Sequence, residues 1–253
     1  MSDSPDRKVA LVTGSGKRRV GNVVARALAE RGYAIALHYN RSADEARATV
    51  DGLRAQGADA EAFQADVADE EQVSRLFTQV QQRFGRLDAL VTAAAVWESK
   101  PLEEVTAADV RRQFDINALG TFLCCQHAGR IMVEQPEGGA IVTIGDWATE
   151  RPYLNYAAYF PGKGAIPAMT RCFAVELAHR NPNVRVNAVL PGPVMVPEEV
   201  GEHERRGVIA GTLVKRLGRP EHVAHAVVFL LQNDFVTGAC LPVDGGRTIA
   251  GGS

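Results

Sequence analysis

Tyr159 and Lys163 lie four residues apart, in the stretch Tyr159-Phe160-Pro161-Gly162-Lys163. On a helix this spacing places both side chains on one face, one turn apart. A lysine ammonium beside a phenol favours the phenolate, so the tyrosine can exchange a proton closer to neutral pH. The pair therefore indicates an acid–base site, although the same spacing also occurs by chance on exposed helix faces. The elements around it decide between the two interpretations.

The bulk composition favours one enzyme-sized domain that acts on a small molecule. The chain has 253 residues, of which 46% are hydrophobic and 23% charged, so it can bury a large core as a single domain over residues 1–253. A net charge of -2 and a pI near 6.3 do not favour nucleic acid or a membrane surface as a partner. The polar start lacks a signal peptide and no apolar run could span a membrane, which predicts a cytoplasmic protein.

The four cysteines form no Cys-x-x-Cys pair, and no histidine cluster accompanies them, so we expect no metal site. Their apolar surroundings predict buried thiols in a reducing compartment. They are Cys124, Cys125, Cys172 and Cys240.

Short apolar runs alternate with amphipathic segments along the whole chain. This alternation predicts an α/β fold, a Rossmann-type doubly wound parallel sheet flanked by helices, whose ligands bind beyond the carboxyl ends of the strands. The expected strands are 9–13, 34–39, 60–65, 88–92, 140–145, 184–190 and 240–243. The expected helices are one that ends at Gly32 and those over 42–56, 69–84, 106–134, 155–180 and 220–232.

The first strand is followed by a glycine-rich turn, Gly14–Gly21, whose backbone amides can hold a pyrophosphate. The second strand ends in Tyr39-Asn40-Arg41-Ser42, without the acidic residue that would hold the ribose hydroxyls of NAD. Arg41 can instead pair with a 2′-phosphate, helped by Ser42 and by Arg18 or Arg19, which favours NADPH. Ser42 could alternatively cap the next helix in a capping box with Glu45. Asp66, after the third strand, could meet the adenine or cap a helix.

Five motifs, which follow one another along the chain, resemble those of the short-chain dehydrogenase/reductases and occur in the same order. They are Thr13-Gly14, Asn117, Tyr159-x-x-x-Lys163, Pro191-Gly192 and Val243-Asp244-Gly245-Gly246. The resemblance implies that Tyr159 is the proton donor, that Lys163 lowers the Tyr159 pKa and holds the nicotinamide ribose, and that Asn117 completes a proton relay. It also implies a homotetramer. The expected cofactor contacts are Gly14, Arg18, Arg19, Val20, Tyr39, Asn40, Arg41, Ser42, Asp66, Val67, Ala94, Lys163, Pro191, Gly192 and Val194.

A narrower resemblance is to the pteridine reductases of that family, through the glycine turn, the second strand and Asp146. Asp146 lies thirteen residues before Tyr159, where ordinary members have a serine. A carboxylate would repel a developing alkoxide but suits a C=N bond, whose nitrogen gains a proton. Trp97 lies where these enzymes place an aromatic against the pterin ring, so Trp97, Asp146 and Tyr159 are the expected substrate contacts. For Trp97 the alternative is an ordinary half-buried loop aromatic, and for Asp146 the alternatives are a helix N-cap and a surface salt bridge.

The chain departs from the family pattern at Thr92-Ala93-Ala94-Ala95, which replaces Asn-Asn-Ala-Gly. Residues 195–215 are polar and are expected to form a substrate lid, with Glu198, Glu199, His203 and Arg205 available. The main hypothesis is an NADPH-dependent reductase of a pterin or a related heteroaromatic substrate, with Asp146, Tyr159, Lys163 and Asn117 as catalytic residues. An NADPH-dependent carbonyl reductase and a non-catalytic NADPH-binding protein are the alternatives.

Overall fold

A computed structural model describes residues 7–197 and 200–250. Within these residues seven strands form one parallel sheet in the order β3-β2-β1-β4-β5-β6-β7. The strands are β1 (Val9–Thr13), β2 (Ala34–Tyr39), β3 (Ala60–Gln64), β4 (Ala89–Thr92), β5 (Gly139–Ile144), β6 (Val184–Pro191) and β7 (Cys240–Val243). The chain winds outward from β1 in both directions, which confirms the predicted Rossmann-type sheet.

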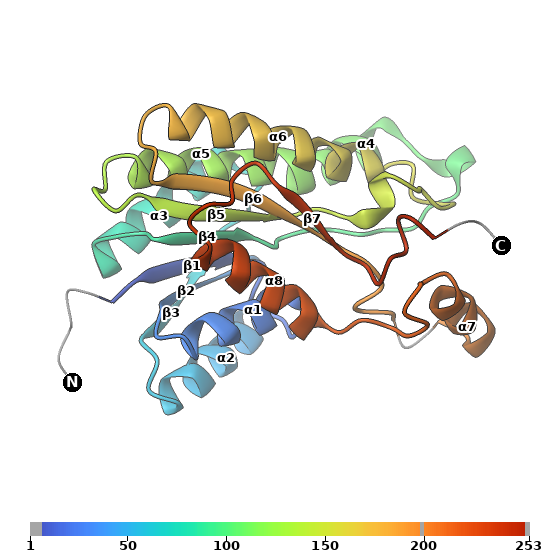
Figure 1. The fold of residues 1–253 in the computed structure, drawn as a ribbon, viewed down its shortest axis with the longest axis horizontal. Coiled ribbons are helices and arrows are strands. Elements are labelled where there is room, and N and C mark those ends of the chain that lie inside the picture. The colour runs from blue at the N-terminus through green and yellow to red at the C-terminus, as the bar shows by residue number, and fades with distance from the viewer. Residues whose placement is uncertain (1–6, 198–199, 251–253) are drawn as a thin grey trace.

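Helices cover both faces of the sheet (Figure 1). One face carries α3 (Glu70–Phe84), α5 (Gly120–Met132) and α6 (Phe160–Ala178), and the other carries α1 (Val20–Ala29), α2 (Ala43–Ala55) and α8 (Pro220–Gln232). The remaining helices are α4 (Ala107–Phe114), α7 (Glu202–Ala210) and the short turns η1 (Leu102–Glu104), η2 (Asp115–Leu119) and η3 (Trp147–Thr149).

The core consists of two apolar layers, one on each side of the sheet. All five residues of β1 are buried, because the central strand of a doubly wound sheet has helices on both faces. Leu11 faces the α3, α5 and α6 layer, whereas Ala10 and Val12 face the α1, α2 and α8 layer. In the second layer, Val24 of α1 belongs to the same cluster as Val227 of α8, so the first and last long helices share one core.

Two of the expected helices are wrong in their extent. The single helix over 106–134 is divided by η2, a π-helical turn in which the Gly120 amide donates to the Asp115 carbonyl. The helix over 155–180 begins only at Phe160, since Asn155 adopts a left-handed φ of 68° and Pro161 lies in the first turn, where proline is tolerated.

The cysteines match the expectation of buried thiols only in part. Cys124 and Cys125 are buried in α5, where burial raises the pKa of the Cys124 thiol to about 12, whereas Cys172 of α6 is exposed.

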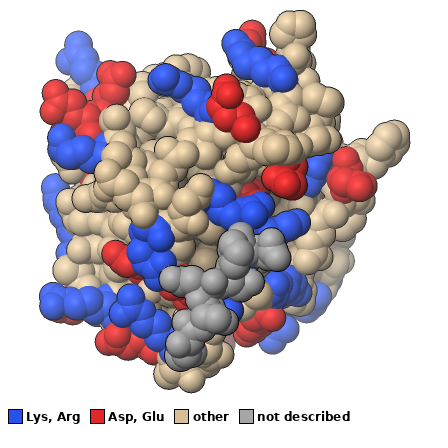
Figure 2. Space-filling view, turned by 90° about the vertical axis from the view of Figure 1, so that its left-hand side faces the viewer, with Lys and Arg blue, Asp and Glu red and all other residues tan. Residues whose placement is uncertain are grey.

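On the face seen in Figure 2, basic and acidic side chains are interspersed, in keeping with the small net charge. No helix among the described residues is long and apolar enough to cross a bilayer.

Candidate active site

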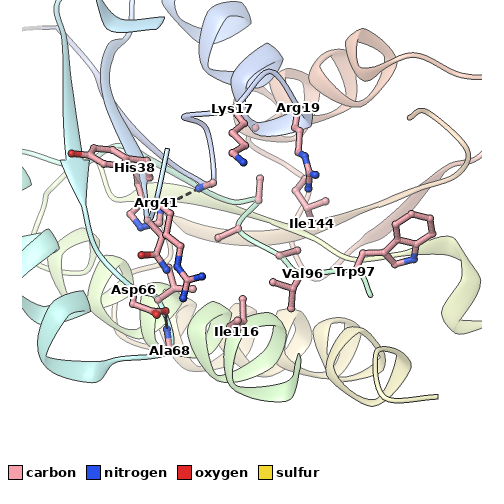
Figure 3. A pocket seen from close by; sticks show the side chains of 18 of the residues that line it. Lys17, Arg19, His38, Arg41, Asp66, Ala68, Val96, Trp97, Ile116 and Ile144 are labelled. Carbon is pink, nitrogen blue, oxygen red and sulfur yellow. Dashed lines mark hydrogen bonds between the residues drawn. The ribbon is translucent and has the colours of Figure 1, made fainter. Parts of the chain in front are cut away.

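A cavity of about 830 Å³ lies beyond the carboxyl ends of the central strands. Its wall is built from the turns that follow β1, β2, β3, β4 and β5 and from α4 and the start of α6. Figure 3 shows Arg41 and Asp66 at one end, Trp97 at the other, and Lys17 and Arg19 along the side between them. The volume of the cavity is within the range of clefts that bind cofactors and other small molecules.

The glycine turn is held by a buried histidine that the motif analysis missed. Gly14 has a φ of +64°, and a Cβ there would lie 2.6 Å from the Cα of Ala94. The Gly14 amide donates to Nδ1 of His38 at 3.0 Å, and His38 Nε2 lies 3.1 Å from the Ala65 carbonyl. Burial lowers the pKa of His38 to about 4, so the ring is neutral, with Nδ1 as acceptor and Nε2–H as donor. The sequence signal that could have indicated this role is a histidine within the otherwise mostly apolar strand β2.

Cationic side chains line the cavity, Arg41 at the end near Asp66 and Lys17 and Arg19 along the adjoining side. Lys17, Arg19 and Arg41 line it together with Tyr39, Asn40 and Ser42, whereas Arg18 is not among its lining residues. A Cβ at Gly16 would lie 2.6 Å from the Ser42 Oγ, so a glycine is needed where the turn meets β2. Ser42 makes no helix-capping hydrogen bond, so the capping box with Glu45 is not formed. These residues fit a nicotinamide dinucleotide cofactor, with the Gly14–Gly21 turn free to hold the pyrophosphate.

Asp66 and Val67 line the cavity after β3, as Ala94 does after β4 and Val20 at the start of α1. The Asp66 carboxylate accepts from the Ala68 amide at 3.0 Å. Asp69, not Asp66, caps α3 by accepting from Gln72, so the alternative role of Asp66 as a helix cap is wrong.

Tyr159 and Asp146 are joined by a direct hydrogen bond next to the start of α6. The Tyr159 hydroxyl donates to Oδ2 of Asp146 at 2.7 Å, and Oδ1 of Asp146 accepts from the Ala148 amide at 2.8 Å. Tyr159 and Lys163 line the cavity, whereas Asp146, an expected substrate contact, is not among the lining residues and is hydrogen-bonded to Tyr159 behind them. Tyr159 precedes the first residue of α6, and Lys163 follows in the first turn, so the predicted shared face is formed.

The ionisation of Tyr159 differs from the expectation. Burial and the Asp146 carboxylate raise the pKa of Tyr159 well above its ordinary value, the opposite of the lowering expected from Lys163. Lys163 is fully buried and donates to the Ile144 carbonyl at 2.8 Å. Burial lowers the pKa of Lys163 to about 8, and the charge of Asp146 opposes that change. The phenol is therefore held as a neutral donor to a carboxylate.

Asn117 lies in the π-helical turn and is completely buried. Its side chain pairs with the backbone of Val96, accepting from the amide and donating to the carbonyl, both at 2.9 Å. The Thr121 hydroxyl donates to the Asn117 carbonyl. The Asn117 side chain thus fixes the loop after β4, which carries Ala94, Val96 and Trp97, and it is not among the residues that line the cavity.

Aromatic rings form the outer end of the site. Trp97 stacks on Tyr156 with ring centroids 4.8 Å apart and an interplanar angle of 14°, and its indole N–H donates to the Tyr153 hydroxyl at 3.0 Å. Tyr153 meets Tyr156 and Phe160 edge-on. Trp97 is 44% exposed, so Tyr156 fixes one face of a ring that still borders the cavity.

Besides Arg18, three further expected cofactor contacts do not line the main cavity. Pro191, Gly192 and Val194 are not among the lining residues of the main cavity, and Val194 lines a second cavity of about 390 Å³. The Gly192 amide donates to the Val243 carbonyl at 3.0 Å, and a Cβ on Gly192 would lie 2.4 Å from the Cα of Asp244. The glycine is required because β6 and the segment after β7 pack backbone against backbone.

The expected lid over 195–215 contains a helix, α7, and Met195 of this segment lines the cavity. Burial raises the pKa of Tyr156, and the charge of Glu204 in α7 adds to this change, so the helix acts electrostatically on the aromatic end of the site. Glu198 and Glu199 lie outside the described residues. Nowhere in residues 7–197 and 200–250 do three or more His, Cys, Asp or Glu side chains gather as potential metal ligands.

The chain is similar to several known oxidoreductases. A family profile described as enoyl-(acyl carrier protein) reductase matches residues 15–248. An uncharacterized oxidoreductase of Methylorubrum extorquens is 38% identical, over 94% of this chain and 97% of the relative. A human 3-oxoacyl-[acyl-carrier-protein] reductase is 36% identical over the same shares, and a hydroxynaphthalene reductase-like protein of Metarhizium majus is 34% identical over 94% of each chain.

A crystal structure of a dehydrogenase/reductase from Sinorhizobium meliloti matches with a TM-score of 0.87 and 33% identity, and covers 95% of this chain and 94% of that chain. The motifs of this chain, its sheet order and these relatives agree. The chain therefore belongs to the short-chain dehydrogenase/reductases, a family of oxidoreductases that use a nicotinamide cofactor.

Proposed function

We propose that this chain is an NADPH-dependent reductase of a ring C=N bond of the pterin type. The observation that carries the proposal is the hydrogen bond from the Tyr159 hydroxyl to the Asp146 carboxylate at 2.7 Å. A carboxylate beside the proton donor is unfavourable for an alkoxide product, because two negative charges would meet. It suits a nitrogen that becomes an N–H group, which the carboxylate can then accept.

The reaction adds one hydride and one proton across the double bond. When bound, a reduced nicotinamide cofactor would supply the hydride. The Tyr159 hydroxyl turns from Asp146 to the nitrogen and transfers its proton as electron density reaches that atom. Because the pKa of Tyr159 is raised, the phenol keeps its proton until the nitrogen becomes the stronger base. Lys163, held by the Ile144 carbonyl, places a positive charge beside the pair and stabilises the phenolate that remains.

The preference for NADPH rests on the charges at the adenosine end. Arg41 lies at that end, Lys17 and Arg19 line the adjoining side of the cavity, and no acidic side chain follows β2 at residues 40–42. A phosphate between these cations forms charge-assisted hydrogen bonds that a ribose hydroxyl cannot form.

Carbonyl reduction is the second candidate, since the relatives include 3-oxoacyl-[acyl-carrier-protein] and hydroxynaphthalene reductase-like proteins. Tyr159 and Lys163 would serve both reactions, whereas Asp146 favours only the first. A substitution of Asp146 should therefore affect the two reactions differently. A protein that binds NADPH without turning over any substrate is the third candidate.

The deciding experiment follows NADPH oxidation with dihydrobiopterin, dihydrofolate, quinoid dihydropteridine, a 3-oxoacyl thioester and a panel of aromatic ketones. We expect turnover on a pterin, and we expect Asp146→Ser to shift the ratio of kcat/KM values toward ketones. Tyr159→Phe should lower kcat by about 10²–10⁴-fold with NADPH affinity retained, the usual size of a general-acid contribution. Tyr33→Phe, at a buried tyrosine that does not line the cavity, is the matched control.

Turnover confined to ketones would reject the pterin assignment and leave the acid–base pair in place. Tight NADPH binding without turnover on any compound would favour the non-catalytic alternative. Unchanged kcat in Tyr159→Phe would remove Tyr159 from the reaction.

A further inference from the structure

Arg247, in the segment after β7, joins three parts of the molecule that are far apart in sequence. Its guanidinium lies over the Trp147 ring, with Cζ 4.9 Å from the ring centroid, and donates to the Val208 carbonyl in α7. Its own carbonyl accepts from Arg151 at 3.1 Å. A single side chain thus contacts the lid helix and the residue that directly follows Asp146.

The segment that carries Arg247 is firmly held. The Asp244 carboxylate accepts from the Gly246 amide at 2.9 Å and from the Thr248 amide and hydroxyl at 2.6 Å each. Arg151 donates to the Ala250 carbonyl as well as to that of Arg247. In Figure 1 this segment and α7 lie at the same end of the molecule. Arg247 therefore extends from a rigid base toward a helix with few other anchors.

The helix α7 has no buried residue, so its own packing contributes little to its position. Its carboxyl end is fixed instead by backbone bonds from Leu213 and Val214 to the Gly245 carbonyl, at 2.9 and 3.2 Å. Next to these bonds, a Cβ on Gly211 would lie 2.9 Å from a terminal nitrogen of Arg247, so the guanidinium fills the space below the end of α7.

The Trp147 contact connects this anchor to the acid–base pair. Trp147 opens the short turn η3, which is capped by Asp146 through the Ala148 amide. The same carboxylate accepts from Tyr159 through its other oxygen. Displacement of Trp147 would therefore move the group that holds the Tyr159 hydroxyl.

We propose that Arg247 is a positioning residue that holds the lid helix α7 against the Trp147 side of the site, so that the lid and Asp146 keep one arrangement around the ring substrate. The part that concerns substrate rests on the proposed function, whereas the contact with α7 does not. Arg247 acts through α7 and Trp147 and touches no reacting atom.

The test compares Arg247→Met, which keeps much of the apolar stem, with Arg247→Lys, which can still donate to the Val208 carbonyl but cannot stack as a plane. Arg180→Met is the matched control, because Arg180 is an exposed arginine that also donates to a backbone carbonyl, in α6. Tryptic cleavage after Arg205 and Arg206, both exposed in α7, reports on the lid without any substrate. Mass spectrometry assigns the cut sites.

For Arg247→Met we expect cleavage in α7 to become about tenfold faster, as local opening becomes more favourable. KM for the ring substrate should rise about tenfold, with kcat within about threefold and NADPH affinity unchanged, because the loss concerns substrate binding. Arg247→Lys should lie between wild type and Arg247→Met, and Arg180→Met should match wild type. Gly211→Ala, which crowds the guanidinium without removing it, should also speed cleavage.

Unchanged cleavage in both Arg247→Met and Gly211→Ala would overturn the anchoring of α7. Faster cleavage with unchanged KM would overturn its link to the substrate. If pterins are not substrates, the proteolysis still tests whether Arg247 anchors α7, and KM is then measured with the ketone that is turned over. The proposed pterin reduction and the proposed role of Arg247 can therefore fail independently.

Discussion

His38 allows a quantitative test of how the glycine turn is fixed. Its neutral ring accepts from the Gly14 amide and donates to the Ala65 carbonyl, and burial lowers its pKa to about 4. The informative change is His38→Asn, since an asparagine oxygen can replace Nδ1 as the acceptor but the shorter side chain does not reach Ala65 and does not titrate.

The size of the effect follows from the partners and from the pKa. Loss of the donor to a buried carbonyl costs roughly 1–3 kcal/mol, so His38→Asn should be less stable by that amount at pH 7. An unfolded histidine takes up a proton near pH 6.5, whereas folded His38 stays neutral down to about pH 4. Between these values the unfolded state binds more protons, so wild type loses about 3 kcal/mol of folding free energy as the pH falls.

The assay is urea unfolding of both proteins at several pH values between 7 and 4, followed by circular dichroism. The stability gap between wild type and His38→Asn should shrink as the pH falls, because only wild type loses the contribution of His38. A gap of about 1 kcal/mol at pH 7 should close near pH 6 and then reverse, and a gap of about 3 kcal/mol should close near pH 4. A gap that stays constant over this range would refute the assignment of a neutral, hydrogen-bonded His38.

Three further outcomes are expected. Gly192→Ala should lower the free energy of unfolding by roughly 1–3 kcal/mol, because its Cβ would overlap the backbone of Asp244, and wild-type stability in urea would contradict this packing. Arg41→Gln should weaken NADPH binding about tenfold or more and leave NADH binding nearly unchanged, as a fluorescence titration can show; equal losses for both cofactors would rule out a 2′-phosphate contact. Turnover should fall as the pH rises through about 8 and Lys163 loses its proton, so a pH–rate profile that stays flat well above this value would reject a role for its charge.

The sheet could be predicted because its strands carry the signal in their own residues. A run such as Val9–Thr13 is apolar at its first four positions without alternation, which is typical of a strand covered on both faces. The break at residues 115–119 could not be predicted in this way, since a π-helical turn keeps helical periodicity nearly intact and depends on one shifted hydrogen bond. Asn155 likewise keeps the expected helix from starting at residue 155 through its φ angle, which the sequence pattern does not encode.

The candidate site was predictable where residue type and spacing suffice. Tyr159, Lys163 and Asp146 are brought together as their spacing suggested. The pKa of Tyr159 was not predictable, because its direction depends on which neighbour the hydroxyl meets and on burial, and both come from tertiary packing. His38 was missed for the same reason, since its function lies in two backbone partners from other turns.

The packing of α1 against α8 has a consequence for the order in which the chain is made. The apolar layer over β1 contains Val24 near the amino terminus and Val227 near the carboxyl terminus. A ribosome-bound fragment that ends before Pro220 contains the first six strands, but the α8 side of this layer is bare. We therefore expect nascent chains to bind chaperones until synthesis has passed Gln232, and the nucleotide-binding half to become protease-resistant only after that point.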